Sequence, residues 1–306
     1  MIKIKKYKNL QIVLFFLVPT LLFYTYFLIM PIFDSLRLSF FSGKLLVPDK
    51  FVGFANYVKL FTVAPFNVRF FNAFLNTIEH FAIVAAIQNI VPFILAVIVS
   101  KRVRFAAFFR VIFFLPSIMP IIVVGFLFKM MLNPVWGVVD KFLKLLHLDF
   151  LIRPWLGDPQ LAIPVISVIG GWVFFGVPFV LFLAGIKGIN SEIVEAARID
   201  GASELGIIKS IMLPMLKPVF GLVTTLAVIG SITQFDLVYA AANAMGDPAY
   251  HTDIFGTLFF RTIFGANQTG VTSDLGLAAA IATIMFLIVL VGAFFVLGAT
   301  RRREEL

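Results

Sequence analysis

Long apolar runs alternate with short polar segments along this chain. A membrane core about 30 Å thick is crossed by roughly 20 apolar residues of helix. Six runs reach that length, at about residues 10–33, 73–99, 106–131, 161–186, 211–237 and 275–299. The pattern therefore predicts an all-α integral membrane protein with six transmembrane helices.

Basic residues gather in segments that six spans would place on one side of the membrane. They lie in KIKKYK near the start, in KRVRFAAFFR at 101–110, within 187–217 and in the final RRREEL. The positive-inside rule assigns such segments to the cytoplasm. We expect both termini there and the segments 34–72, 132–160 and 238–274 outside. The first run is too long for a signal peptide and lacks an A-x-A-like cleavage site, so we expect an uncleaved anchor.

Composition agrees with this class and excludes several functions. Hydrophobic residues make up 61% of the chain and charged residues 13%, whereas globular domains are near half apolar and a quarter charged. The net charge of +9 fits basic cytoplasmic loops better than nucleic-acid binding. There is no cysteine, no Walker-type phosphate loop, and no HExxH or GxSxG motif. We therefore expect no thiol chemistry, no ATP hydrolysis by this chain and no enzymatic activity.

Ionisable residues are scarce inside the predicted spans. Glu79, His80, Lys129 and Asp236 lie toward span ends, where placement at the membrane interface costs least. The three histidines lack metal-site spacing, so we expect them in interfaces or loops. Gln88 and Asn89, in the second span, are candidates for hydrogen bonds between helices or for polar contacts in a pathway.

Prolines interrupt most of the predicted spans. In a membrane helix they kink the axis and free a carbonyl, which suits helices around a moving pathway. The prolines concerned are Pro19, Pro92, Pro116, Pro120, Pro164, Pro178, Pro214 and Pro218.

A polar segment between the fourth and fifth runs departs from the membrane pattern. Ser191 is expected to cap a short helix, and Glu195 and Arg198 have the i, i+3 spacing of an ion pair. Gly201 stands where a left-handed helix end needs glycine, and Ser203 is expected to start a second helix. The segment is predicted to form helix, turn and helix on the cytoplasmic surface.

One face of the first helix in this segment carries small residues. Ile193, Ala196, Ala197 and Asp200 share that face at helical spacing, which suits a groove on a rigid partner. The alternative is an amphipathic helix lying on lipid headgroups.

A family signature covers the same residues. The segment EAARIDGASELGIIKSIMLPMLKP resembles the EAA---G---------I-LP signature of binding-protein-dependent ABC transporter permeases, and EAARIDGAS with LPMLKP resembles the carbohydrate class. The resemblance extends to FLVPTLLFYTYFLIMPIFDSLRLSF, FVGFANYVKLF, FFRVIFFLPSIMP and WLGDPQLAIP. The loop FDLVYAAANAMGDPAYHTDIFGTLFFRTIFG and the RRREEL end favour the first of two permease halves, of the maltose or glycerol-phosphate permease type. Gly206 and Ile208 depart from the Gln and Phe common in the family, which weakens the expected docking but not the class.

The resemblance implies the fold, the partners and one site. It implies the type I ABC importer permease fold in a prokaryotic cell membrane, a heterodimer with a second permease subunit, two ATPase subunits and an extracytoplasmic solute-binding protein. No cofactor would be bound by this chain, and ATP and Mg would belong to the ATPase subunits. The residues implied to dock on the ATPase are Glu195, Ala196, Ala197, Asp200, Gly201 and Pro214.

The resemblance also divides the chain. Residues 1–72 would hold the N-terminal tail, the first span and an outer segment, 73–299 a five-helix core with the coupling loop at 187–214, and 300–306 a cytoplasmic tail. The substrate is expected to be a sugar or oligosaccharide; the alternatives are glycerol phosphate or another polar solute and, more remotely, a passive channel.

A solute pathway for sugars requires aromatic faces and neutral polar groups. Family likeness and composition point to a set on the fourth and fifth spans, although each member alone could equally pack helices together. The set is Trp172, Val173, Phe174, Ser231 and Gln234. No basic residue is convincingly placed toward such a pathway, which favours neutral sugars over anionic solutes.

Overall fold

The structure is a computed structural model that describes residues 2–43, 50–101, 106–265 and 273–300. These residues are mostly helical, so the all-α prediction is confirmed; the strands within them form a small hairpin of β1 (Phe41–Ser42) and β2 (Lys50–Phe51). Much of the predicted basic segments, including RRREEL, and all but the first residue of the predicted 300–306 tail lie outside the described residues. The chain divides into two compact units, one of residues 1–63 with 262–284 and one of residues 64–261 with 285–306.

Three described helices are long and apolar enough to cross a membrane. They are the stretch Val13–Leu38, α4 (Phe66–Ser100) and α16 (Leu275–Thr300). Three further apolar stretches are pairs of helices bent by 91°, 50° and 65°. Counting each pair as one span gives up to six, which is compatible with the predicted number.

In the first unit, a hairpin and a short helix surround the start of α16. α1 (Ile2–Tyr24), a π-helical turn (Thr25–Ile29) and α2 (Met30–Leu38) lead into β1, and α3 (Ala55–Thr62) follows β2. Asn56 in α3 donates hydrogen bonds to the carbonyls of Ser39 and Phe41, both at 2.8 Å. Gly276 passes so close that a β-carbon there would overlap the Phe41 carbonyl oxygen. Glycine is therefore required at that contact.

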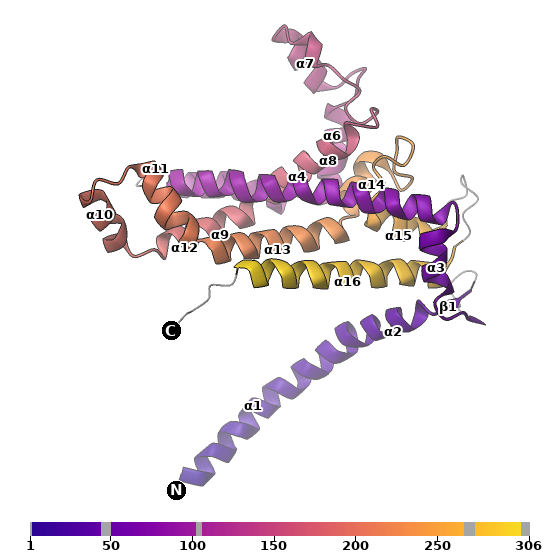
Figure 1. The fold of residues 1–306 in the computed structure, drawn as a ribbon, viewed down its shortest axis with the longest axis horizontal. Coiled ribbons are helices and arrows are strands. Elements are labelled where there is room, and N and C mark those ends of the chain that lie inside the picture. Colours follow the sequence, from indigo (N-terminus) through magenta and orange to yellow (C-terminus); the bar gives the residue numbers. More distant parts are fainter. Residues whose placement is uncertain (1, 44–49, 102–105, 266–272, 301–306) are drawn as a thin grey trace. The chain divides into compact units, whose positions relative to one another are not determined.

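The second unit is a helical bundle around α4. α4 packs along α8 (Ala162–Val173), α9 (Gly176–Lys187) and α13 (Lys217–Thr233), and α14 (Asp236–Ala242) packs on α6 (Ile121–Met131) (Figure 1). One apolar core joins α4, α9 and α13, and another joins α6, α8 and α14. Between α4 and α13, Asn89 donates to Thr224 Oγ1 at 3.2 Å, which confirms the predicted hydrogen bond between helices for that residue.

Shorter elements complete the second unit. α5 (Ala106–Phe114) runs through a 3₁₀ turn (Leu115–Ile118) toward α6, and α7 (Val138–Leu145) is followed by a 3₁₀ turn (Asp149–Leu151). The loop between α9 and α13 holds α10 (Ser191–Ile199), α11 (Glu204–Ile207), a π-helical turn (Ile208–Met212) and α12 (Leu213–Met215). α15 (Phe255–Phe264) crosses the boundary between the two units.

The helix breaks fall at prolines in several of the predicted places. The run predicted over 106–131 bends sharply: it breaks beside Pro120, one of the prolines expected to kink a helix, and the halves lie at 91°. The fourth run breaks before Pro178 and the fifth before Pro218, because proline has no N–H for the preceding helical turn. Pro19 and Pro92, by contrast, lie within unbroken helices.

α4 is longer than a membrane span requires. Its 35 residues extend about 52 Å at 1.5 Å per residue, against an apolar core of about 30 Å. The predicted boundary between residues 72 and 73 falls inside this helix. Its first turns bind the loop between α14 and α15: Asn72 donates to the Tyr250 carbonyl at 2.6 Å and Asn76 to the Asp253 carbonyl at 2.9 Å.

A buried ion pair organises that loop. Arg261 and Asp253 have side chains 2% and 0% exposed, and the guanidinium binds both carboxylate oxygens. Arg261 also donates to the Ala244 carbonyl at 2.9 Å. The guanidinium carbon atoms of Arg69 and Arg261 lie over the Tyr250 ring, 5.2 and 5.3 Å from its centroid. Because charge is fully compensated, this buried pair is tolerated.

We expect Arg261→Met to destabilise the folded chain by about 3–5 kcal/mol, since it leaves the Asp253 carboxylate buried without its partner. Thermal unfolding of the purified protein in detergent measures the change. Arg153→Met is the matched control, because Arg153 is exposed, and should shift stability by no more than about 0.5 kcal/mol. Equal melting temperatures for the two variants would contradict the assignment.

Candidate functional site

The polar loop begins with a capped helix. The Asn190 side chain accepts a hydrogen bond from the Glu192 N–H at 3.0 Å, and α10 starts at Ser191. The predicted cap at Ser191 is therefore wrong by one position. Asparagine fills the capping role as well as serine does, and the sequence offers both side by side.

Gly201 ends this helix as predicted. Its φ is +82°, the left-handed conformation that glycine adopts without a side-chain penalty. The Gly201 N–H bonds to the Arg198 carbonyl at 3.1 Å and the Ala202 N–H to the Ala197 carbonyl at 2.9 Å, the pair of bonds that defines a Schellman motif. Nothing lies within 4 Å of a β-carbon built on Gly201. Backbone conformation, not space, demands glycine here.

The second helix starts at the predicted residue. The Ser203 hydroxyl accepts from the Gly206 N–H at 3.1 Å and caps α11. From there the chain passes through the π-helical turn and α12, which contains Pro214, into α13. The helix, turn and helix prediction is confirmed in form.

Glu204 connects the loop to the end of α4. Its carboxylate lies 2.8 Å from Lys101 Nζ and 3.1 Å from Arg198 Nη2. The predicted pair of Glu195 with Arg198 is therefore wrong, because Arg198 turns to the next helix instead. Exposed pairs of this kind each contribute only about 0–1 kcal/mol. Together the two ion pairs connect α10 and α11 with Lys101, the residue after α4.

The residues expected to dock on a partner are uncovered by this chain. No residue of α10 is buried; Glu195, Ala196, Asp200, Gly201 and Pro214 are exposed and Ala197 is half-buried. Ile199, at the end of the helix, is 87% exposed. A short helix that buries so little against its own bundle has its surface available for another molecule.

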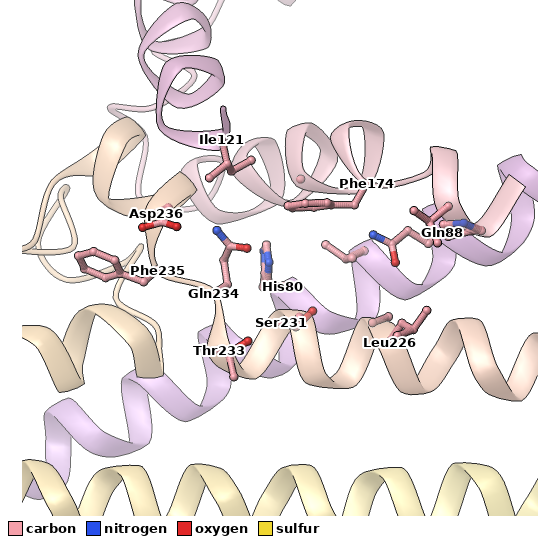
Figure 2. Close-up of a pocket in the computed structure, with 16 residues that line it drawn as sticks. His80, Gln88, Ile121, Phe174, Leu226, Ser231, Thr233, Gln234, Phe235 and Asp236 are labelled. Carbon is pink, nitrogen blue, oxygen red and sulfur yellow. The ribbon is translucent and has the colours of Figure 1, made fainter. Parts of the chain in front are cut away.

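A cavity of about 400 Å³ lies between α4, α8, α9 and α13 (Figure 2). That volume is within the range of small-molecule sites. Its walls combine apolar and aromatic side chains with a few polar groups, and none of the described residues lining it is Lys or Arg. The polar lining residues are His80, Gln88, Ser231, Thr233, Gln234 and Asp236.

The cavity brings together part of the predicted pathway set. Phe174, Ser231 and Gln234 line it. Val173 does not, because its side chain is 1% exposed and belongs to the core of α6, α8 and α14. Trp172 is outside the lining as well, and its ring packs edge-on against Phe128 with centroids 5.8 Å apart.

Three polar lining residues were not expected at a site: His80 and Asp236 were predicted at span ends, and Thr233 was not singled out. Gln88, for which both helix packing and a pathway role were left open, lines the cavity as well. His80 is 2% exposed and faces the cavity, so the prediction of an interfacial or loop histidine is wrong for it. The helical register carries the signal: His80, Val84 and Gln88 repeat every four residues and share one face of α4.

The His80 ring is held by the neighbouring helix. Its Nδ1 lies 2.8 Å from the Ser167 hydroxyl, which also donates to the Ile163 carbonyl at 2.6 Å. Ser231, on the adjoining wall formed by α13, has a buried hydroxyl without a hydrogen-bond partner among the described residues. Buried polar atoms normally have a hydrogen-bond partner, so the Ser231 hydroxyl is available to a molecule bound in the cavity.

Comparisons with known proteins give a consistent picture. A family model described as binding-protein-dependent transport system inner membrane component matches residues 88–304. The chain is 31% identical over 279 residues to the probable ABC transporter permease protein YurN of Bacillus subtilis (strain 168), covering 90% of this chain and 91% of that protein. It is 30% identical over 292 residues to the lactose transport system permease protein LacF of Rhizobium radiobacter, covering 94% of both.

A solved structure shares the fold. It is the crystal structure of a bacterial ABC transporter involved in the import of the acidic polysaccharide alginate, with a TM-score of 0.80, 23% sequence identity and coverage of 100% of both chains. At that identity the likeness concerns the fold alone.

Proposed function

Because the chain belongs to the family of binding-protein-dependent transport system inner membrane components, we propose that it is one permease half of an ATP-driven importer for a neutral sugar or oligosaccharide. The other half would be a second, similar permease subunit. Two ATPase subunits would hold ATP and Mg, and an extracytoplasmic solute-binding protein would deliver the sugar. With both termini cytoplasmic, the polar loop would face the ATPase subunits.

The cavity is the observation that carries the choice of substrate. Its lining joins Phe174 and Phe235 to neutral polar side chains and one carboxylate, Asp236, and no described lining residue is a cation. Aromatic and neutral polar groups suit sugar rings, whereas a phosphate or uronate group would need Lys or Arg to offset its desolvation. The name of LacF, which concerns lactose, supports the same class.

The loop supplies a physical route from ATPase to cavity. α10 would dock on the ATPase subunit through Glu195, Ala196, Ala197, Asp200 and Gly201, with Pro214 starting the return to the membrane. The chain continues from α12 into α13, which carries Ser231. The contact of Lys101 with Glu204 adds a second route, into α4. Movement of the loop would then reach two walls of the cavity.

Uptake into proteoliposomes tests the substrate class. We expect the complete transporter with its solute-binding protein to import at least one member of a panel of radiolabelled neutral mono-, di- and oligosaccharides, and only with ATP. Glycerol phosphate and an oligouronate serve as the anionic arms. Uptake confined to an anionic arm would contradict the neutral-sugar proposal, and uptake without ATP would favour a passive channel.

Gly201→Val tests the coupling route. A β-branched residue at φ +82° costs about 1–2 kcal/mol, so the turn after α10 should change shape. We expect ATP-dependent uptake to fall at least tenfold while the ATPase activity of the assembled complex persists.

Gly201→Asn is the control for that test, because asparagine tolerates the left-handed region. It should retain most of the uptake. Normal uptake with normal coupling in Gly201→Val would remove α10 and its turn from the proposed route.

A further inference from the structure

The hydrogen bonds around His80 fix which ring nitrogen carries the proton. Ser167 has a single hydroxyl hydrogen, and donating it to the Ile163 carbonyl at 2.6 Å leaves the oxygen as an acceptor. The contact of 2.8 Å with His80 Nδ1 is then satisfied when Nδ1 bears the hydrogen and donates it. The neutral ring has one N–H, so Nε2 keeps its lone pair and is an acceptor.

The Nε2 atom has no hydrogen-bond partner among the described residues, although the ring is 2% exposed and lines the cavity. Ser231, on the adjoining wall, has a buried hydroxyl that has no hydrogen-bond partner among the described residues. Burial of that hydroxyl without a hydrogen bond costs free energy, and the His80 ring with its unpartnered Nε2 lines the same cavity. A bound molecule that fills the cavity would satisfy both.

We propose that His80 is a specificity-determining residue whose Nε2 accepts a hydrogen bond from a hydroxyl group of the transported saccharide, while Ser231 binds a neighbouring oxygen. This inference rests on the proposed function and states how the proposed binding site recognises the solute. An acceptor fixed in this way selects a hydroxyl, which can donate, over an ether or carboxylate oxygen, which cannot. Figure 2 shows His80, Ser231 and Gln234 around the same part of the cavity.

The competing explanation is that His80 only ties α4 to α8 through Ser167. Two substitutions separate the roles. In His80→Asn the amide nitrogen can take the place of Nδ1 and keep the bond to Ser167, but nothing replaces Nε2. In His80→Gln the longer amide places its oxygen near the position of Nε2, while the bond to Ser167 is lost.

Binding to the assembled complex, without the solute-binding protein, is the first measurement. The probe is the most strongly imported saccharide of the uptake panel, radiolabelled. We expect His80→Asn to bind it about three- to tenfold more weakly than the wild type, the loss of one hydrogen bond, and His80→Gln to remain close to the wild type. The reverse order, or equal binding by all three proteins, would overturn the inference.

Monodeoxy analogues of the same saccharide provide a second measurement that needs no variant. One analogue should bind the wild-type complex three- to tenfold more weakly, and in His80→Asn that penalty should disappear because the acceptor is already gone. Uniform binding of every analogue to the wild type would overturn the inference even where a variant fails to assemble. If the wild type imports no saccharide of the panel, the proposed function itself has failed.

Discussion

Where a membrane helix breaks, the backbone N–H and C=O groups that lose their helical hydrogen bonds need new partners. This constraint shapes the second unit. Where the fourth run bends by 50° between α8 and α9, the Val173 carbonyl accepts a hydrogen bond from the Ser117 hydroxyl at 2.8 Å. The donor comes from the turn between α5 and α6, and the run formed by these two helices is itself bent. Two broken runs therefore support each other, and Phe174, at the bend between α8 and α9, lines the cavity.

Local sequence signals foretold the loop well. The turn at Gly201, the cap at Ser203 and the approximate extents of the apolar runs follow from rules that act within a few residues. The size of the 91° bend beside Pro120 did not follow from such rules, because a proline weakens a helix without fixing the angle of the bend. Pro92, for example, leaves its helix unbroken. The burial of His80 depends on α8 packing against it, a contact between positions 87 residues apart.

Two helices reach both the loop and the cavity. α13 follows directly from the loop and carries Ser231, while α4 carries His80 and ends next to Lys101, which meets Glu204. Rigid helices transmit a displacement along their length, and small shifts at one end of a packed element can bias the arrangement at the other. The same helix, α4, is longer than the membrane core, and its first turns bind the loop between α14 and α15 at the other end of the helix.

α10 contributes almost nothing to the core that it serves. None of its residues is buried, and its turn is set by backbone geometry at one glycine with open space around it. Substitutions on its outer face should therefore leave the stability of the bundle almost unchanged. If α10 docks on an ATPase subunit as proposed, the fit to that partner can change at this face while the fold that carries it stays the same.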